Sequence, residues 1–404
     1  APTEIYSLSL HDALPILPDS PTHAEPRCLE IDPAALDPAV TEEDERDFLR
    51  INDVSLSPEQ IARIASPGRA YPRQEYVLAV HWHPEHVPME LLKKRIDALY
   101  PNRVGELVVP TQHNVLMDYD GFQGVEVDCY SSGFNRKVQL LLHFQNLDRE
   151  RAEVLQSMLR HTHRYRASQL FEYLDALAES AFDDRRQRAA GRTNAEEDLV
   201  AFVRVQAAKI KRLILAHEAE LPDDVYKNKL VRNFLDAKRV RYGDRLINRA
   251  QVYAKAVKDL VKEEFSLSYF YRASEVIEEA RSLGAGVVIP HPEQFWPILL
   301  ADYDVDGIEV WNPQSQQYTE FLINVVNRRN RMGWHGKRPI LVFMGDDCHM
   351  SEKVRPLAEQ DPAKAAREIG LQPAWHDFNI QKSLLKSDMS RRKVIDEYRG
   401  RLSG

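Results

Sequence analysis

The chain is poor in cysteine and has no long apolar run, and each shortage excludes a class of protein. Only Cys28, Cys129 and Cys348 occur among 404 residues, and this odd number without paired spacing does not suit a disulfide framework. A cytoplasmic location is therefore expected. No apolar stretch reaches the roughly 18 residues that a membrane-spanning helix needs, so we expect no membrane partner. No feature of the sequence indicates an oligomeric state.

Neither a charge of one sign nor a repeated segment dominates the sequence. The formal net charge is −8 at pH 7, which argues against a surface built wholly for nucleic acid but is compatible with a local basic patch. Hydrophobic residues make up 43% of the chain, enough for a large buried core. With no internal repeat, the simplest organisation is one α/β catalytic domain split by a helical insertion.

The first part of the chain shows little sign of a catalytic domain. Residues 1–20 lack the basic start and apolar core of a signal peptide and resemble a non-native or disordered leader. Residues 21–75 are rich in proline and acidic residues and are expected to form a lead-in. It contains one short helix over 42–51, capped by Thr41.

Short β-rich apolar runs lie on both sides of the expected insertion. The catalytic domain is expected to cover residues 76–147 and 286–404, and the charged, helix-forming insertion to cover 148–285. Near-continuous apolar strands that alternate with helices predict a parallel, doubly covered sheet or a barrel. Strand ends converge on one mouth in a parallel barrel, so side chains at those ends would meet. The strand-end candidates are His81, His83, His113, Glu126, His143, His291, Asp347 and His349.

The spacing within two of these motifs favours a shared metal ion. His81 and His83 are separated by one residue, so on a strand both imidazoles emerge from one face while Trp82 points to the outer layer. Asp347 and His349 repeat this spacing. Imidazole and carboxylate together suit Zn, Mn and Fe, so the sequence predicts a metal-dependent hydrolase.

The ordered motifs resemble those of the PHP (polymerase and histidinol phosphatase) metal-dependent phosphoesterases. The resemblance implies an α/β fold with a distorted (β/α)7 barrel, interrupted here by the helical insertion, and two or three divalent Mn, Zn or Fe ions. It implies hydrolysis of a phosphoester by a hydroxide that bridges two metals. The segments that carry it are His81-Trp-His83, Thr111-Gln-His113, Gly124-Val-Glu126, His143, Ile289-Pro-His291 and Asp347-Cys-His349.

The resemblance also distributes the ligands among three metals, with two departures from the family's pattern. Met89 stands where a third-site histidine is usual, and His86 is the nearest substitute. Gln112 stands where the family commonly has an aspartate. By this resemblance the first metal is held by His81, His83, Glu126 and Asp347, the second by Glu126, His143 and His291, and the third by His113 and His349.

The candidate catalytic residues are His113, Asp347 and His349. His113 or His349 would stabilise charge on the phosphoryl oxygens, and His349 would protonate the leaving group if it is not a metal ligand. The sequence leaves both roles of His349 open. Asn312 follows a predicted strand and is the candidate substrate-binding residue, while Glu309 within that strand is expected to point into the barrel.

Other polar residues fall outside this constellation. Arg136 and Lys137 precede the strand that ends at His143, so they are expected at the far face of the barrel. No functional signal is found beyond about residue 350.

The insertion leaves the barrel just after His143, so we expect its helices to cap the active site and select the substrate. Its basic stretch over 227–258 is either a solvated helix face or a contact for a small phosphorylated substrate. In one alternative the protein is a nuclease-like phosphodiesterase that contacts nucleic acid there. In another it hydrolyses a different ester or amide, as amidohydrolase-like barrels do.

Overall fold

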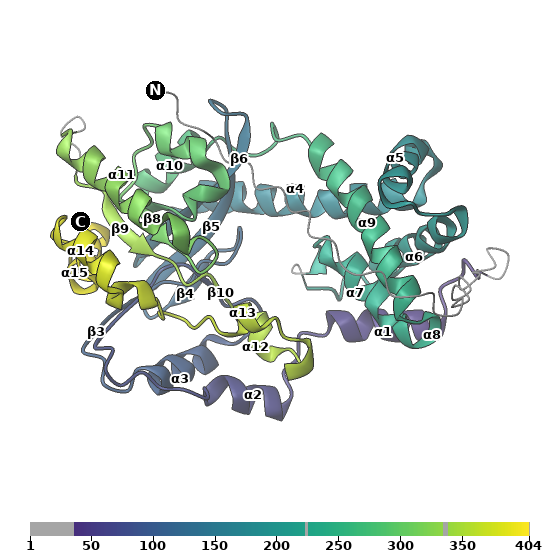
Figure 1. The fold of residues 1–404 in the computed structure, drawn as a ribbon, viewed down its shortest axis with the longest axis horizontal. Coiled ribbons are helices and arrows are strands. Elements are labelled where there is room, and N and C mark those ends of the chain that lie inside the picture. The colour runs from purple at the N-terminus through teal and green to yellow at the C-terminus, as the bar shows by residue number, and fades with distance from the viewer. Residues whose placement is uncertain (1–35, 223–224, 334–337, 404) are drawn as a thin grey trace, which may run out of the picture.

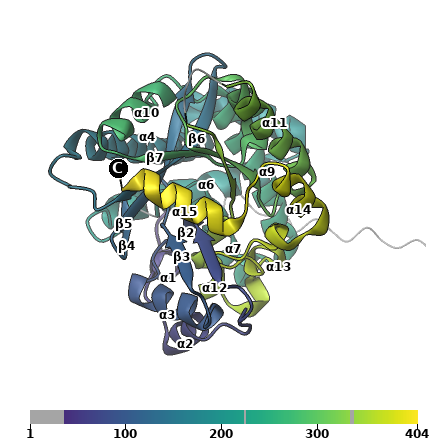
Figure 2. The same cartoon turned by 90° about the vertical axis from the view of Figure 1, so that its left-hand side faces the viewer.

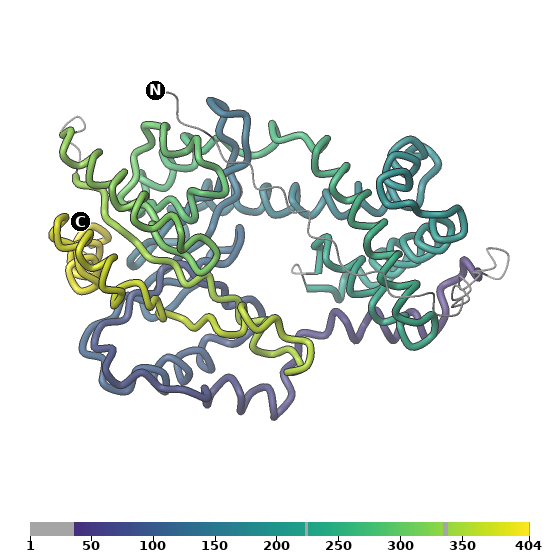
Figure 3. Tube along the Cα trace, viewed as in Figure 1, coloured from purple at the N-terminus to yellow at the C-terminus, as the bar shows by residue number. Residues whose placement is uncertain are grey.

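The structure is a computed structural model, and it describes residues 36–222, 225–333 and 338–403 (Figure 1). The leader expected at residues 1–20 lies outside the described residues. The chain forms a strand-containing body and a helical body that lie side by side, and its trace passes between the two more than once (Figure 3). Within the described residues, no helix has both the length and the apolar character needed to cross a membrane.

Three sheets make up the strand-containing body. The largest has six strands in the order β4-β5-β6-β7-β8-β9, antiparallel from β4 to β7 and parallel from β7 to β9. Two smaller parallel sheets pair β1 with β3 and β2 with β10. The strands are β1 (Tyr76–Ala79), β2 (Trp82–His83), β3 (Gly105–Val108), β4 (Met117–Tyr119), β5 (Phe122–Ser131), β6 (Arg136–Gln145), β7 (Gly286–Ile289), β8 (Gly307–Trp311), β9 (Leu341–Met344) and β10 (Cys348–His349).

The α/β class is confirmed, but the expected closed barrel is not. Strand pairing in the described residues gives open sheets, and the largest is mixed because β5 and β6 are joined by a short connection and run antiparallel. Single backbone hydrogen bonds still link the sheets where the strands end. The amide of Asp347 donates to the carbonyl of His81 at 2.9 Å, and that of Glu126 donates to Gln112 at 3.1 Å. These links join the residues that follow β1 and β9 to one another, and the residues that follow β3 to the middle of β5, so Glu126 does not lie at the strand end expected from the sequence.

The helical body has its own apolar core. Its first helix begins after Thr41, whose side chain accepts a hydrogen bond from the amide of Asp44 in a capping box, and this confirms the short helix expected over 42–51. This helix packs on α6 and α7, where Asp44 lies 2.8 Å from both Lys209 and Lys238. The helices are α1 (Glu42–Asn52), α4 (Glu153–Ala178), α5 (Asp183–Thr193), α6 (Glu197–Ala216), α7 (Lys229–Ala237), α8 (Arg239–Tyr242) and α9 (Asp244–Glu264).

The remaining helices surround the strands. The C-terminal helix α15 packs against β1, β3, β6, β7 and β9. Seen from the left-hand side of Figure 1, it crosses in front of the strands, with the helical body behind them (Figure 2). The helices are α2 (Pro58–Ala65), α3 (Met89–Leu99), α10 (Ala273–Ser282), α11 (Thr319–Arg331), α12 (Met350–Val354), α13 (Pro362–Ala365), α14 (Phe378–Leu385) and α15 (Arg391–Leu402).

Candidate metal centre

The H-x-H pair lies where β1 ends and β2 follows. His81 and His83 emerge from the same side of the extended chain, and their ring centroids lie 5.6 Å apart. Trp82 points the other way into an apolar cluster, where it meets the ring of Tyr119 edge-on at 6.3 Å. The sequence prediction that both imidazoles share one face is therefore confirmed.

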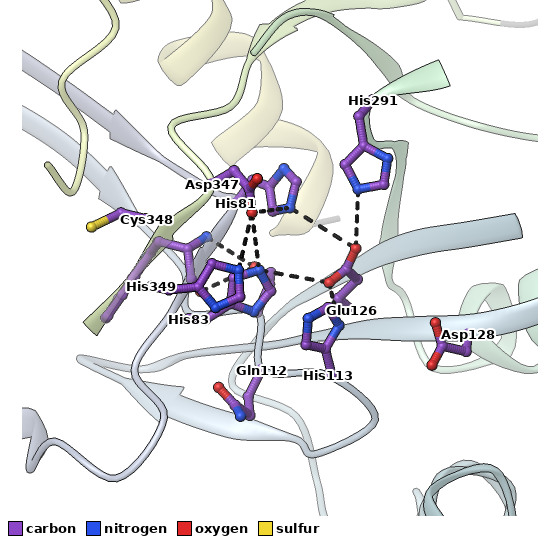
Figure 4. A network of polar contacts seen from close by, with 12 residues as sticks. His81, His83, Gln112, His113, Glu126, Asp128, His291, Asp347, Cys348 and His349 are labelled. Carbon is purple, nitrogen blue, oxygen red and sulfur yellow. Dashed lines mark hydrogen bonds and ion pairs between the residues drawn. The ribbon is translucent and has the colours of Figure 1, made fainter. Parts of the chain in front are cut away.

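Glu126 of β5 completes a first group with the two histidines. Its Oε1 lies 3.9 Å from Nε2 of His81, and its Oε2 lies 3.6 Å from Nε2 of His83. All three side chains are buried. Their ligand atoms lie close enough together to hold a metal ion (Figure 4).

A second group shares His83 with the first. The ring of His83 stacks between His113 and His349, with centroids 4.4 and 4.2 Å away. The three histidines could also hold an ion. His113 lies in the loop after β3 and forms an isolated β-bridge with Glu126 of β5. Nδ1 of His113 lies 2.6 Å from Oε2 of Glu126. Glu126 therefore touches both groups.

Asp347 faces the imidazoles from the opposite side. Its Oδ1 lies 3.8, 3.5 and 3.4 Å from Nε2 of His81, His83 and His349, in that order. The residue has a φ of +46°, a conformation that costs free energy for a side chain other than glycine. Arg367 holds it there by donating to its carbonyl at 3.0 Å and to its Oδ2 at 2.8 Å.

His291, which follows β7, approaches the first group. Its Nε2 lies 3.4 Å from Oε1 of Glu126, and its ring centroid lies 5.3 Å from that of His81. Its φ of +25° is also unfavourable for a non-glycine residue. The amide of His291 donates to Glu309 at 3.2 Å, which anchors this conformation.

The buried ligand atoms fit a divalent cation. Nε2 of His81 and both ring nitrogens of His83 are buried and have no hydrogen-bond partner among the described residues. A buried polar atom without a partner costs about 1–3 kcal/mol. Tetrahedral ligands about 2.0–2.2 Å from a metal lie roughly 3.4 Å apart, close to the separations seen here. Imidazole and carboxylate donors suit Zn, Mn or Fe.

The charges of the site also favour a cation. Burial alone would lower the pKa of His81, but the carboxylates of Glu309 and Asp347 outweigh it and raise the pKa to about 10. Burial, together with the neighbouring imidazoles, lowers the pKa of His83 to about 3. Burial would raise the pKa of Glu126, but the surrounding histidines hold it well below its usual range. His81 therefore carries an additional proton at neutral pH, and a bound metal ion would supply that positive charge instead.

Glu309 supports His81 from behind. Its Oε2 lies 2.6 Å from Nδ1 of His81, which leaves Nε2 of that ring turned toward the first group. Asn312 donates to the other oxygen of Glu309 at 3.1 Å and accepts from the amide of Gln314. The expected substrate-binding residue therefore lies buried behind the site, where it positions Glu309. A Cβ at Gly345 would collide with the same carboxylate.

His143 is not brought into either group, although the sequence placed it among the metal ligands. Its Nδ1 lies 2.7 Å from the hydroxyl of Tyr398, and its Nε2 lies 2.9 Å from the carbonyl of Val80. Both ring nitrogens are thus engaged by protein atoms. The antiparallel β6 directs this side chain toward α15, and the sequence signal could not show that direction.

His86, the expected substitute for the third site, is half-buried and also belongs to neither group. Its neighbour Glu85 has a φ of +54° and reaches the site instead, with Oε1 3.4 Å from Nδ1 of His349. Gln112 accepts a hydrogen bond from the amide of Glu85 at 3.1 Å. Gln112, which stands where the PHP family commonly has an aspartate, thus stabilises the turn at Glu85.

Two further basic side chains were missed or misplaced by sequence reasoning. Arg367 contacts Asp347 from the segment that carried no functional signal, because its partner lies far away in the sequence. Lys137 was expected at the far face. Since β6 runs antiparallel to β5, its start lies beside Asp128, two residues after Glu126.

The helical body approaches the edge of the site. Burial would raise the pKa of Glu85, but His349, Ser351 and then the charge of Lys229 on α7 lower it below its usual range. Lys229 is therefore close enough to act on a carboxylate that contacts the second group.

Comparisons with known proteins give a distant structural likeness. No protein-family model matches the chain, and no curated protein matches it significantly. Among solved structures, the chain is similar to a proposed metal-dependent phosphoesterase from Bifidobacterium adolescentis, with a TM-score of 0.36 and 16% sequence identity. The similarity covers 78% of this chain and 97% of that one. A likeness at this level leaves the function to be inferred from the geometry of the site.

Proposed function

We propose that this protein is a metal-dependent hydrolase that cleaves phosphoesters in the manner of the PHP phosphoesterases. The observation that carries the proposal is the pair of overlapping ligand groups with His83 in common. Nε2 of His81 and both ring nitrogens of His83 are buried and have no hydrogen-bond partner among the described residues. Glu126 touches both groups, as expected of a carboxylate that bridges two ions.

In the proposed reaction, bound metal ions and protein side chains have separate roles. When bound, divalent ions supply a water of lowered pKa and a Lewis acid for the phosphoryl oxygens. Glu309, Asn312 and Arg367 position the ligands His81 and Asp347. These contacts hold the buried metal ligands in fixed positions, and the substrate would be oriented by them.

If His349 does not hold a metal ion in the second group, it is the proposed proton donor to the leaving oxygen. Its side chain is 32% exposed, against 1% for His83, so a substrate can reach it. Burial would lower its pKa, but Asp347 and Glu85 raise it to about 9, so the ring is protonated at neutral pH. His113 is 21% exposed and lies on the same open side, where it would stabilise charge on the phosphoryl group.

The helical body is proposed to cap the site and to select a small phosphorylated substrate. The electrostatic effect of Lys229 on α7 supports this role, because its charge helps to lower the pKa of Glu85, which contacts His349 of the second ligand group. A cap of this kind excludes water and adds contacts to parts of the substrate that do not react.

Metal analysis and a substrate panel test the proposal. Purified protein should bind more than one equivalent of Mn, Zn or Fe, and absence of metal after loading with each would refute it. With Mn added, phosphate monoesters and diesters should be hydrolysed in preference to carboxylic esters and amides. Turnover of carboxylic esters or amides alone would favour the amidohydrolase-like alternative, and preference for polynucleotides would favour the nuclease-like one.

Variants connect any activity to this site. His81→Ala and Asp347→Ala should abolish turnover and lower the bound metal. His161→Ala, which changes an exposed histidine on α4, should leave both unchanged. Full activity in both site variants would place the active site elsewhere.

A further inference from the structure

Gln314 is an exposed side chain that contacts the metal centre and has no role in the proposed chemistry. It lies in the loop after β8, and its Nε2 donates to Oδ2 of Asp347 at 2.9 Å. The other oxygen of that carboxylate faces Nε2 of His81, His83 and His349. One carboxylate therefore separates the amide of Gln314 from the ligand nitrogens, and the residue is open to solvent.

Support of Asp347 does not by itself explain why an exposed residue is used. Arg367 already donates to the same Oδ2 at 2.8 Å, and its side chain is only 8% exposed. Two donors thus hold one oxygen atom, one of them from the interior and one from the solvent side. Of the two, Gln314 is the donor that a substrate can reach.

The contact with Asp347 fixes the direction of the Gln314 amide. A carboxylate oxygen accepts hydrogen bonds, so the NH2 group must face Asp347, and the carbonyl oxygen Oε1 must point elsewhere. Oε1 has no hydrogen-bond partner among the described residues. Gln314 thus presents an unused hydrogen-bond acceptor beside the metal centre.

The backbone that carries this side chain is also held in place. The side chain of Asn312 accepts a hydrogen bond from the amide of Gln314 at 3.0 Å, and its carbonyl accepts one from the amide of the buried Ser315 at 3.0 Å. A long side chain that is held at both ends loses little further freedom when a ligand binds. Asn312, the substrate-binding residue expected from the sequence, thus positions the exposed residue two places further along.

We propose that Gln314 binds the substrate and selects a phosphoester that carries a hydroxyl group near its ester oxygen. This inference rests on the proposed function and names its substrate class. A carbonyl oxygen accepts a hydrogen bond from a hydroxyl, whereas it repels the oxygens of a second phosphate. A hydroxyl close to a phosphoryl group held at the ligands of Asp347 reaches Oε1 of Gln314. Phosphate esters of diols, polyols and sugars belong to this class.

Matched substrates test this selection in the full-length, Mn-loaded protein. Hydroxyethyl phosphate carries the donor, ethyl phosphate lacks it, and methoxyethyl phosphate has the oxygen atom but cannot donate. The wild-type kcat/KM should be about five- to tenfold higher for hydroxyethyl phosphate than for either of the others, the scale of one hydrogen bond. Equal values for the hydroxyl and methoxy substrates would overturn the proposal.

Gln314→Leu should abolish this preference. The variant also removes a partner of Asp347, so kcat is expected to fall for all three substrates. The ratio of kcat/KM between hydroxyethyl and ethyl phosphate cancels that shared loss and should drop to about one. Gln317→Leu, which changes an exposed glutamine of the same loop, is the matched control and should keep both the ratio and the turnover. A wild-type ratio in Gln314→Leu would show that Gln314 only supports Asp347 and would overturn the proposal.

Binding of phosphonates separates this inference from the proposed function. Hydroxypropyl phosphonate and propyl phosphonate cannot be hydrolysed, and they differ by the same terminal hydroxyl. In calorimetry the first should bind the Mn-loaded wild type about five- to tenfold more tightly, and Gln314→Leu should abolish the difference. If no phosphoester is hydrolysed but this difference remains, the proposed function fails and the selection by Gln314 stands. Hydrolysis without any difference in binding or in kcat/KM would refute the selection alone.

Discussion

Glu309 holds His81 through a 2.6 Å contact between Oε2 and Nδ1, and both side chains are buried. The contact leaves Nε2 of His81 facing Glu126 and Asp347, at 3.9 and 3.8 Å. A carboxylate behind a histidine fixes the ring orientation and increases its basicity as a ligand. Metal affinity should therefore depend on a residue outside both ligand groups.

Replacing Glu309 by Gln should weaken metal binding by about 10- to 100-fold, because the amide keeps the shape but loses the charge. Competition with a chromogenic chelator measures this affinity. Glu278→Gln, at an exposed position of α10, should leave it unchanged. Wild-type affinity in Glu309→Gln would show that the contact does not support the metal.

Gly345→Ala should disturb the same contact from the other side. Its Cβ would collide with the Glu309 carboxylate, whereas Gly400 on α15 has no atom within 4 Å of such a Cβ. Overpacking should lower the free energy of unfolding by about 1–3 kcal/mol and reduce bound metal. Gly400→Ala should be neutral or stabilising by up to about 1 kcal/mol, since alanine favours helices. Urea unfolding and metal analysis measure both effects, and equal stability of the two variants would contradict the collision.

His143 should behave as a support and not as a metal ligand. Its ring contacts the Tyr398 hydroxyl and the Val80 carbonyl. His143→Gln should lower the free energy of unfolding by about 1–3 kcal/mol and leave the number of bound metals unchanged. Tyr398→Phe removes one of these contacts and should have a smaller effect in the same direction. Loss of one metal equivalent in His143→Gln would restore the ligand role expected from the sequence.

His349→Gln separates proton donation from metal binding. General acid catalysis contributes about 10²–10⁴-fold, and mostly for poor leaving groups. The variant should therefore lose about 100-fold in kcat/KM with alkyl phosphates and less than about tenfold with 4-nitrophenyl phosphate. If His349 donates the proton, the metal content measured on the same samples should not change. A loss of metal with equal losses on both substrates would identify His349 as a ligand.

The ion-pair cluster of Asp44 should make the helical body sensitive to acid. Burial would raise the pKa of Asp44, but Lys209 and Lys238 lower it below its usual range. A carboxyl whose pKa is lowered by folding contributes stability above its unfolded pKa of about 3.9 and loses that contribution as the pH falls through the folded value.

Asp44→Asn should therefore reduce the free energy of unfolding at pH 7 by about 3–5 kcal/mol, because it leaves the buried amine of Lys209 without its carboxylate and leaves Lys238 with Asp47 alone. The difference from wild type should shrink in strong acid. Urea unfolding at pH 7 and at pH 3 measures both values. Asp97→Asn removes a more exposed partner of Arg103 and should cost less than about 1 kcal/mol. A difference between wild type and Asp44→Asn that does not depend on pH would contradict the pKa argument.

The sequence by itself was sufficient for the features that depend on neighbouring residues. The alternation of a strand placed His81 and His83 on one face, and the cap at Thr41 marked the start of α1. Histidines and carboxylates that follow predicted strands also identified most of the cluster, although Glu126 lies in the middle of β5. Backbone geometry over two to four residues determines the strand alternation and the helix cap.

Only the tertiary structure decided the direction of the strands and the partners of each side chain. The antiparallel β6 turned His143 toward Tyr398 and brought Lys137 beside Asp128. Contacts between distant segments joined Arg367 to Asp347. These features follow from which segments pack together, and a periodic pattern carries no information about partners far away in the chain. The local pattern thus supplied the chemical groups, and long-range packing determined which of them meet.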